Sequence, residues 1–222
     1  MFVAFVLLVS IFGLAISATL LGNPVPVSQG PANRRVIIAL VYDSVCLAGM
    51  VAALFPAACS RAVRSRPSAE KQEAVQRRTT TILGISFLHG HHPVEPKPAE
   101  HELLVGGKSF CATCYGLLSG AVLSLTVVTV VAVSSWPGWT QSEPAFFMYY
   151  VGVAAVVLGL AQTLVLRLGA RARFILAMVF VVGTSLMLLA TDLITADFMA
   201  DLFVVLLAVF WLLSRISLSH RT

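Results

Sequence analysis

Cysteines and histidines that could bind a metal ion gather in one short stretch of the chain. Cys111 and Cys114 form a C-x2-C pair, and four of the five histidines lie just upstream, between residues 89 and 101. A tetrahedral Zn²⁺ site needs four nitrogen or sulfur ligands, and such a pair supplies two of them from a single turn. The stretch therefore predicts one zinc site.

Histidines that precede the cysteines are the expected source of the other two ligands. His89 with His92 or His91 is the expected combination, and His101 is a spare. A ligating imidazole usually donates its second N–H to a carboxylate or a carbonyl. The acids close enough in sequence to accept that hydrogen bond are Glu95, Glu100 and Glu102.

Two other interpretations fit the same residues. The histidines could be ordinary polar loop residues, while the cysteines only pack against the rest of the protein. Alternatively, Cys111 and Cys114 could be the dithiol of a membrane thiol–disulfide oxidoreductase, since a helix start stabilises thiolate. Cys59 could then approach Cys111 as a further thiol. The expected location on the reducing side of the membrane argues against this enzyme.

The composition is that of a membrane protein. Of the 222 residues, 58% are hydrophobic and 11% are charged, and the mean hydropathy is +0.91, whereas about a quarter of the residues in soluble domains are charged. About 20 apolar residues cross the hydrocarbon core, and an open strand there would leave its backbone unpaired. We therefore expect one all-α domain of six transmembrane helices, over residues 1–21, 36–58, 112–134, 146–166, 173–191 and 198–214.

The basic residues predict how these helices are oriented. Thirteen of the fifteen Lys and Arg residues fall on one side of the six-span topology, and only Arg34 and Arg35 fall on the other. Basic residues mark the cytoplasmic side. This predicts a plasma-membrane protein with both termini and the long loop 59–110 in the cytoplasm. Within the loop we expect a helix over 68–88, followed by an extended segment that contains three prolines.

The first apolar stretch has a second interpretation. A signal peptide could end in the small residues 15–18, but the apolar run is long for the hydrophobic region of such a peptide. We therefore expect a helix that is retained.

Acidic residues in apolar segments are candidate ion or proton sites. Asp43 lies inside the second stretch, where an ionisable side chain is costly and is by default a functional candidate. It could pair with Arg34 or Arg35, or it could serve a small transporter. Asp197 and Asp201 are one turn apart at the expected start of the last helix. The helix dipole favours acids there, and a bound cation is the alternative.

Residues 106–120 resemble the core of the DUF2085 family of multi-pass membrane proteins of archaea and bacteria. Four residues match its pattern C-A-R-C-T-G-x-x-x-G: Cys111, Cys114, Gly116 and Gly120. His89 would match an upstream histidine of the family. The resemblance implies a multi-pass membrane protein with a metal site and no known reaction.

Three departures from the family pattern bear on the ligand set. Thr113 and Tyr115 replace the usual arginine and threonine, and Leu88 stands where the family has an upstream cysteine. His91 or His92 could replace that lost ligand. Independently of the family, small residues spaced as in G-x-x-x-G let a second helix approach closely, so we expect the two matching glycines to form a helix-packing face.

These features predict a non-enzymatic membrane component. Its structural zinc site would join the loop to the third helix, and lateral partner subunits in the lipid bilayer would make it an accessory subunit of a larger complex. The alternatives are the thiol oxidoreductase and a transporter that uses Asp43. The chain carries no nucleotide-binding loop, and its basic residues follow the membrane topology rather than a nucleic-acid site.

Overall fold

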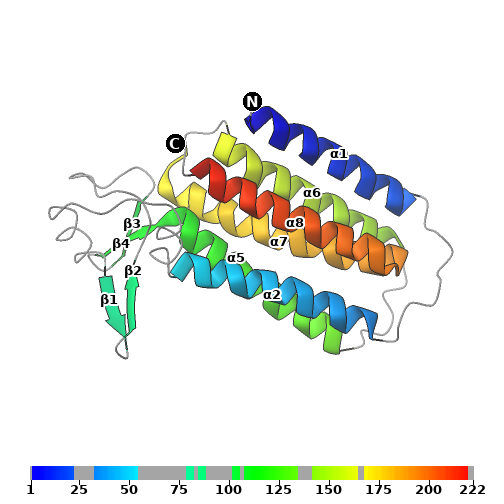
Figure 1. The fold of residues 1–222 in the computed structure, drawn as a ribbon, viewed down its shortest axis with the longest axis horizontal. Helices are drawn as coiled ribbons and strands as arrows, with labels where there is room; N and C mark the ends of the chain where they lie inside the picture. Colours follow the sequence, from blue (N-terminus) through cyan, green and yellow to red (C-terminus); the bar gives the residue numbers. More distant parts are fainter. Residues whose placement is uncertain are drawn as a thin grey trace.

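The computed structural model describes residues 2–22, 33–54, 79–82, 85–88, 102–105, 108–134, 142–164 and 168–219. Over these residues the chain forms six long helices that run side by side in an elongated bundle (Figure 1). Each helix overlaps one of the six apolar stretches of the sequence. Their bounds are α1 (Phe2–Gly22), α2 (Arg34–Leu54), α5 (Ala112–Val133), α6 (Ser142–Leu164), α7 (Ala170–Thr195) and α8 (Phe198–Ser219).

Five of the helices are long and apolar enough to cross a membrane, as expected for a helical multi-pass membrane protein. They are α1, α5, the segment Pro144–Gln162 of α6, α7 and the segment Phe198–Arg215 of α8. The sixth helix, α2, begins with two arginines and carries Asp43 in its middle. The sixth span therefore stays a prediction.

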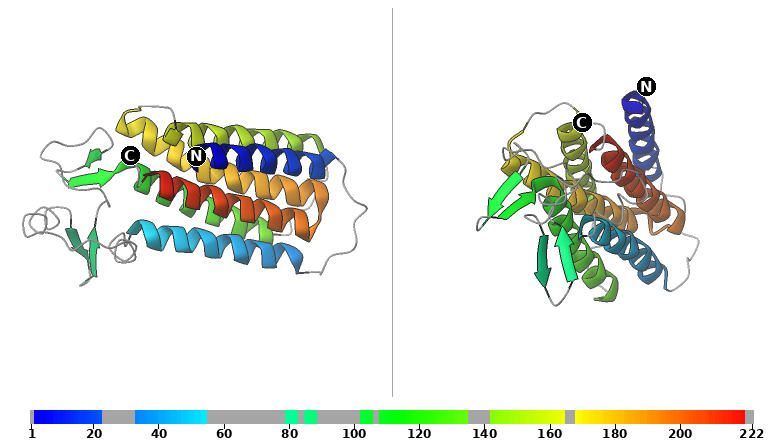
Figure 2. Two further views of the ribbon diagram at one scale, coloured as in Figure 1. Left: turned by 45° about the horizontal axis from the view of Figure 1, so that its top comes forward. Right: turned by 60° about the vertical axis from the view of Figure 1, so that its left-hand side comes forward.

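Helix α7 is at the centre of the bundle. It packs against α5, α6 and α8, and 56% of its most apolar stretch is buried. For α1 the corresponding share is 22%, and this helix lies at the periphery, where it contacts α8 and α7 (Figure 2). Groups that need to be shielded from lipid are therefore best placed around α7.

Two small hairpins add β structure that the sequence analysis did not predict. Strand β1 (Thr79–Ile82) pairs antiparallel with β2 (Ile85–Leu88), and β3 (Glu102–Val105) pairs antiparallel with β4 (Lys108–Cys111). The helix expected over 68–88 is therefore wrong for its second half. Three consecutive threonines and two isoleucines favour strands there. The first half, 68–78, lies outside the described residues.

The hairpins define one end of the bundle. Strand β4 runs directly into the first residue of α5, and both hairpins lie at the same end as the C-terminus (Figure 1). We call this the hairpin end; it also contains the end of α6 and the start of α7. We call the opposite end the turn end, because Ala196 and Asp197 connect α7 to α8 there. Ala196 adopts φ 49°, and its N–H donates to the carbonyl of Asp192 at 3.1 Å.

Candidate functional site

The two closely spaced cysteines lie at the hairpin end, where a strand becomes a helix. Cys111 is the last residue of β4 and the N-cap of α5, and Cys114 is the third residue of that helix. Cys111 is buried, Cys114 is half-buried, and the two side chains are neighbours that interact with each other. The start of a helix presents unpaired N–H groups and the positive end of the dipole, which favour negatively charged sulfur. The two thiols can therefore act together on one ligand.

Neighbouring residues hold the hairpin against the helix. The rings of Phe110 and Tyr115 meet edge to face, with their centroids 4.9 Å apart. In the hairpin register, Glu102 pairs directly with Cys111. The position of the cysteines is thus fixed both by the helix that they begin and by the strand pair that leads into it.

The histidine half of the expected zinc site lies outside the described residues. This applies to His89, His91, His92 and His101, and also to the acids Glu95 and Glu100. Glu102 is described only through its backbone position in β3. Within the described part of the chain, no three His, Cys, Asp or Glu residues come together as a metal-binding group. The structure therefore describes only the cysteine half of the expected site.

A buried arginine lies at the same end of the bundle. Arg215, near the end of α8, is 1% exposed. It donates from Nη1 to the carbonyl of Gly159 at 3.2 Å and from Nη2 to Oε1 of Gln162 at 3.0 Å. Its guanidinium carbon lies 5.0 Å from the centre of the Phe180 ring. Helices α6, α7 and α8 thus all contribute to holding this positive charge in place.

The last helix is longer than the sequence predicted. The predicted bounds ended at residue 214 and left Arg215 outside the helix, whereas α8 continues to Ser219. Apolar residues at 216 and 218 follow the arginine, and they were the available signal that the helix had not ended.

Close contact between α5 and α7 sets the position of the cysteines relative to the bundle. A Cβ added at Gly116 would lie 2.3 Å from the carbonyl oxygen of Phe174, and one added at Gly120 would lie 2.7 Å from that of Met178. Both glycines are buried on the face of α5 that meets α7. The G-x-x-x-G spacing therefore lies at a helix–helix contact just beyond the cysteine pair.

A second charged group occupies the turn end. Arg34 donates to Asp192, and from Nη1 to Oδ2 of Asp201 at 2.8 Å. Arg35 donates from Nε to Asp192 at 2.8 Å. Asp201 is fully buried, so α2 is tied to α7 and α8 by ion pairs inside the protein. Here two arginines meet two aspartates, and the charges balance.

Asp43 does not use these arginines, so the expected pairing with Arg34 or Arg35 is wrong. Eight or nine residues separate them along one helix, which is roughly 12–14 Å at 1.5 Å per residue. Instead, Thr129 of α5 donates to Oδ2 of Asp43 at 2.8 Å. Within the described part of the chain, the other carboxylate oxygen of Asp43 is buried without a hydrogen-bond partner.

Asp197 and Asp201 have different surroundings despite their spacing. Asp197 accepts the N–H of Ala200 at 3.2 Å, as a residue that caps the start of a helix does. Asp201 instead faces Arg34. The two carboxylates therefore act separately, one as a cap and one as an ion-pair partner.

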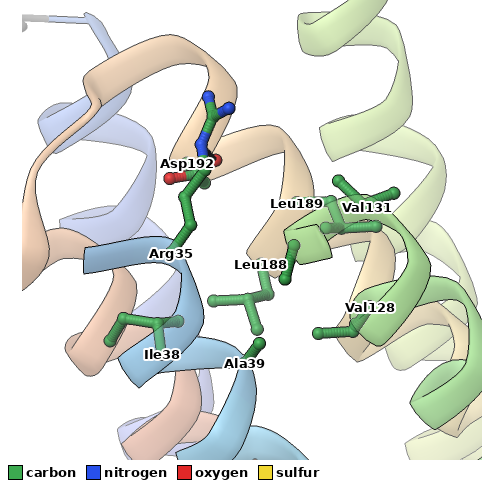
Figure 3. Close-up of a pocket in the computed structure, with 9 residues that line it drawn as sticks. Arg35, Ile38, Ala39, Val128, Val131, Leu188, Leu189 and Asp192 are labelled. Carbon is green, nitrogen blue, oxygen red and sulfur yellow. Dashed lines mark ion pairs between the residues drawn. The ribbon is translucent and has the colours of Figure 1, made fainter. Parts of the chain in front are cut away.

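A small pocket lies beside the turn-end ion pairs (Figure 3). Its volume is about 20 Å³, which is room for about one water molecule. Apolar side chains such as Ile38, Val128 and Leu188 form most of its wall, and the Arg35–Asp192 pair lies at one edge. Its lining contains no cysteine or histidine.

Comparison of the chain with protein-family models, with curated proteins and with solved structures found no match. The resemblance to DUF2085 therefore stays a prediction.

Proposed function

We propose that this chain is an integral membrane protein with a zinc site at the start of α5. Cys111 and Cys114 supply two ligands, and histidines of the preceding loop supply the other two. The observation that supports this most is the neighbouring position of the two thiols at a helix start. That arrangement brings two sulfur donors to one point, as a tetrahedral Zn²⁺ ion requires.

The hairpin register bears on the choice of histidines. His101 directly precedes Glu102, and Glu102 pairs with Cys111. The chain thus attaches His101 to a residue that lies opposite Cys111 in the hairpin. We therefore place it beside His89, His91 and His92 as a ligand candidate, rather than as a spare.

A structural role fits this location. Two ligands begin a transmembrane helix, and two come from the loop that precedes it, so the ion would fix the loop to the bundle. Such sites contribute folding energy directly. We infer a non-enzymatic membrane component that acts as an accessory subunit, since the apolar outer surface of the bundle offers room for lateral partners.

Metal analysis of the protein purified anaerobically in detergent tests the zinc site. We expect about one zinc per chain, lost in Cys111→Ser, Cys114→Ser and His101→Ala. Cys46→Ser is the matched control, because Cys46 is also buried but lies within α2. Wild-type protein without zinc, or zinc retained in both cysteine variants, would contradict the proposal.

The contact between the two thiols also supports a second candidate, a thiol–disulfide oxidoreductase. In that reaction Cys111 and Cys114 lose two protons and two electrons and form a disulfide, while a quinone takes up both and becomes a quinol. The expected signs are no bound metal and a disulfide that forms with quinone and is reversed by dithiothreitol. Zinc bound at one equivalent and thiols that resist quinone would exclude this candidate.

We further propose that the protein lies in the plasma membrane and that its hairpin end faces the cytoplasm. Arg34 and Arg35 are paired with aspartates, and the other thirteen basic residues of the sequence all lie on the opposite side of the predicted topology. In intact cells, a membrane-impermeant maleimide should label Asn33→Cys and leave Arg171→Cys unlabelled, with the wild type as background. Both positions are exposed at opposite ends of the bundle. The reverse pattern would invert the topology.

A further inference from the structure

Asp43 is an acidic side chain among apolar neighbours near the middle of α2. Within the described part of the chain, no lysine or arginine forms an ion pair with it. The exposed residues around it on α2 include Leu40, Val41 and Leu47, and α2 packs against the apolar helix α5. An ionised carboxylate in such surroundings is costly, and an acid inside a membrane protein usually marks a function.

The two oxygens of the Asp43 carboxylate have different surroundings. Oδ2 accepts a hydrogen bond from the hydroxyl of Thr129 at 2.8 Å. Oδ1 is buried, and among the described residues it has no hydrogen-bond partner. A charged oxygen that is buried without a partner is costly, and a proton bound to it removes the charge. Oδ1 is therefore the atom at which a ligand of Asp43 is expected.

The surroundings of Asp43 fit a proton better than a metal ion. In the ranges that the structure describes, Asp43 belongs to no group of three His, Cys, Asp or Glu side chains. Ca²⁺ and Mg²⁺ typically take about six or more oxygen ligands. A proton needs a single oxygen, and Oδ1 supplies it.

The pocket beside the turn-end ion pairs leads toward this carboxylate (Figure 3). The side chain of Arg35 at its edge is 42% exposed, so the pocket begins at the surface. Ala39, which lines the pocket, lies one turn before Asp43 on the same face of α2, and Val128, which also lines it, directly precedes Thr129. Cβ atoms of residues four apart on a helix are roughly 5–6 Å from each other. The pocket thus comes within about one helical turn of Asp43, with room for about one water molecule.

Few other ionisable groups are close to Asp43. On α2 its ionisable neighbours are Tyr42 and Cys46, and the Tyr42 hydroxyl lies 2.9 Å from that of Thr184 on α7. The helices around α2 carry their ionisable side chains toward their ends: Cys114 and Tyr115 on α5, Arg171, Arg173 and Asp192 on α7, and Asp201 and Arg215 on α8. No ion-pair partner therefore holds Asp43 in its charged form.

We propose that Asp43 is a proton-binding site inside the bundle, reached from the turn end through the pocket between α2, α5 and α7. In the ionised state Thr129 donates to Oδ2, and in the neutral state Oδ1 carries one proton taken from water at the turn end. The site is separate from the zinc site proposed above, so Asp43→Asn should keep the zinc content of the wild type.

Dicyclohexylcarbodiimide is the probe for the protonated state. This apolar reagent adds to a protonated carboxyl group and leaves ionised carboxylates unmodified. We expect mass spectrometry of the wild type in detergent to find the adduct on Asp43 at low pH and to lose it as the pH rises. Asp192 is the internal control, because its ion pairs with Arg34 and Arg35 keep it ionised and unlabelled.

The Thr129 hydroxyl provides a second readout. A hydrogen bond to the ionised carboxylate favours that form, so labelling of Asp43 in Thr129→Val should persist to a higher pH than in the wild type. Thr126→Val is the control, because the Thr126 hydroxyl donates to the carbonyl of Val122 in its own helix.

The route is tested by hydrogen exchange. The infrared carbonyl band that is missing in Asp43→Asn reports the protonated carboxyl, and it shifts when heavy water replaces water. Val131→Phe fills the pocket and should slow this shift severalfold, whereas Val130→Phe, at a position 53% exposed on the same helix, should not. Ala132→Val is a smaller change in the pocket lining, for use if Val131→Phe does not fold.

Three results would overturn the proposal. Asp43 could stay unlabelled at every pH at which the wild type is folded, or it could be labelled equally at all of them. Protection of Asp43 by sodium ions at a fixed pH would show a cation site instead of a proton site. An unchanged exchange rate in both folded pocket variants would overturn the route through the pocket.

Discussion

Each end of the bundle buries an arginine, but the groups that surround the two arginines differ. At the turn end, Arg34 faces Asp192 and Asp201, and the ion pairs link α2 to α7 and α8. At the hairpin end, Arg215 faces neutral oxygens and an aromatic ring. A balanced group is sufficient to hold helices together. Within the described residues, no carboxylate balances the charge of Arg215.

The sequence separation between the residues that interact also differs between the two ends. The partners at the turn end are 158 and 167 residues apart in sequence, so they join distant helices. The cysteines at the hairpin end are three residues apart, and β4 delivers them directly into α5. Local sequence therefore builds the cysteine pair, whereas the ion pairs of the turn end form only in the assembled bundle. We therefore expect substitutions at the turn end to change mainly the stability of the protein.

The largest expected effect comes from breaking the balance at the turn end. Arg34→Met removes the ion-pair partner of the fully buried Asp201, and breaking a buried pair in this way typically costs about 3–5 kcal/mol. Thermal unfolding in detergent would measure the loss. Arg35→Met is the control, because the Arg35 side chain is 42% exposed, and we expect it to cost less than about 1 kcal/mol.

A paired substitution sharpens this test. Replacing Arg34 and Asp201 together with apolar residues removes both charges, and we expect it to recover most of the loss, since no buried charge is left unpaired. If the double variant is as unstable as Arg34→Met alone, the arginine stabilises the bundle through packing rather than charge. Zinc content should stay at the wild-type level in every turn-end variant that folds.

A smaller effect is expected from the contact that positions the hairpin end. Gly116→Ala places a Cβ 2.3 Å from the Phe174 carbonyl oxygen, so α5 has to move away from α7. Forced overpacking typically costs about 1–3 kcal/mol. Because the cysteines begin α5, zinc affinity should fall as well. Gly49→Ala is the control: its Cβ would lie 3.7 Å from Leu212, and we expect a neutral or slightly stabilised protein.

An unchanged zinc affinity in Gly116→Ala, together with a lowered melting temperature, would show that zinc affinity does not depend on the stability of the bundle. It would mean that the cysteine pair depends on the hairpin rather than on the contact between α5 and α7. A fully stable Gly116→Ala variant would contradict the close approach itself.

The sequence predicted those features that depend on local composition. Long apolar runs require helices in a membrane, and each run overlaps a helix of the structure. A cysteine that directly precedes an apolar run also predicts the start of a helix. Ion pairs such as Arg34–Asp201 depend on which faces of distant helices meet, and residue spacing does not contain this information.

Two local errors have physical causes as well. The segment from Thr79 to Leu88 has acids before it and apolar residues within it, which suggested a helix, but β-branched residues and a glycine at 84 favour a hairpin. Asp43 was expected to reach an arginine of its own helix. Helix geometry puts that arginine two turns or more away, and a threonine of the neighbouring helix is nearer.

The smallest expected effect concerns the middle of the bundle, between the two charged ends. Thr129→Val removes the hydroxyl that donates to Asp43, and it leaves a carboxylate of α2 without that partner. Hydrogen bonds between helices in membranes contribute about 0.6 kcal/mol on average and up to about 2 kcal/mol, so we expect a loss of about 1 kcal/mol on thermal unfolding. Thr126→Val is the control, because Thr126 is exposed and donates to the carbonyl of Val122 in its own helix.

Asp43→Asn in the Thr129→Val background should restore stability if Asp43 is charged and structural, since an amide is less costly to bury than a carboxylate. If that variant stays unstable, the charge of Asp43 is not the cause, and the middle of the bundle is held by packing alone.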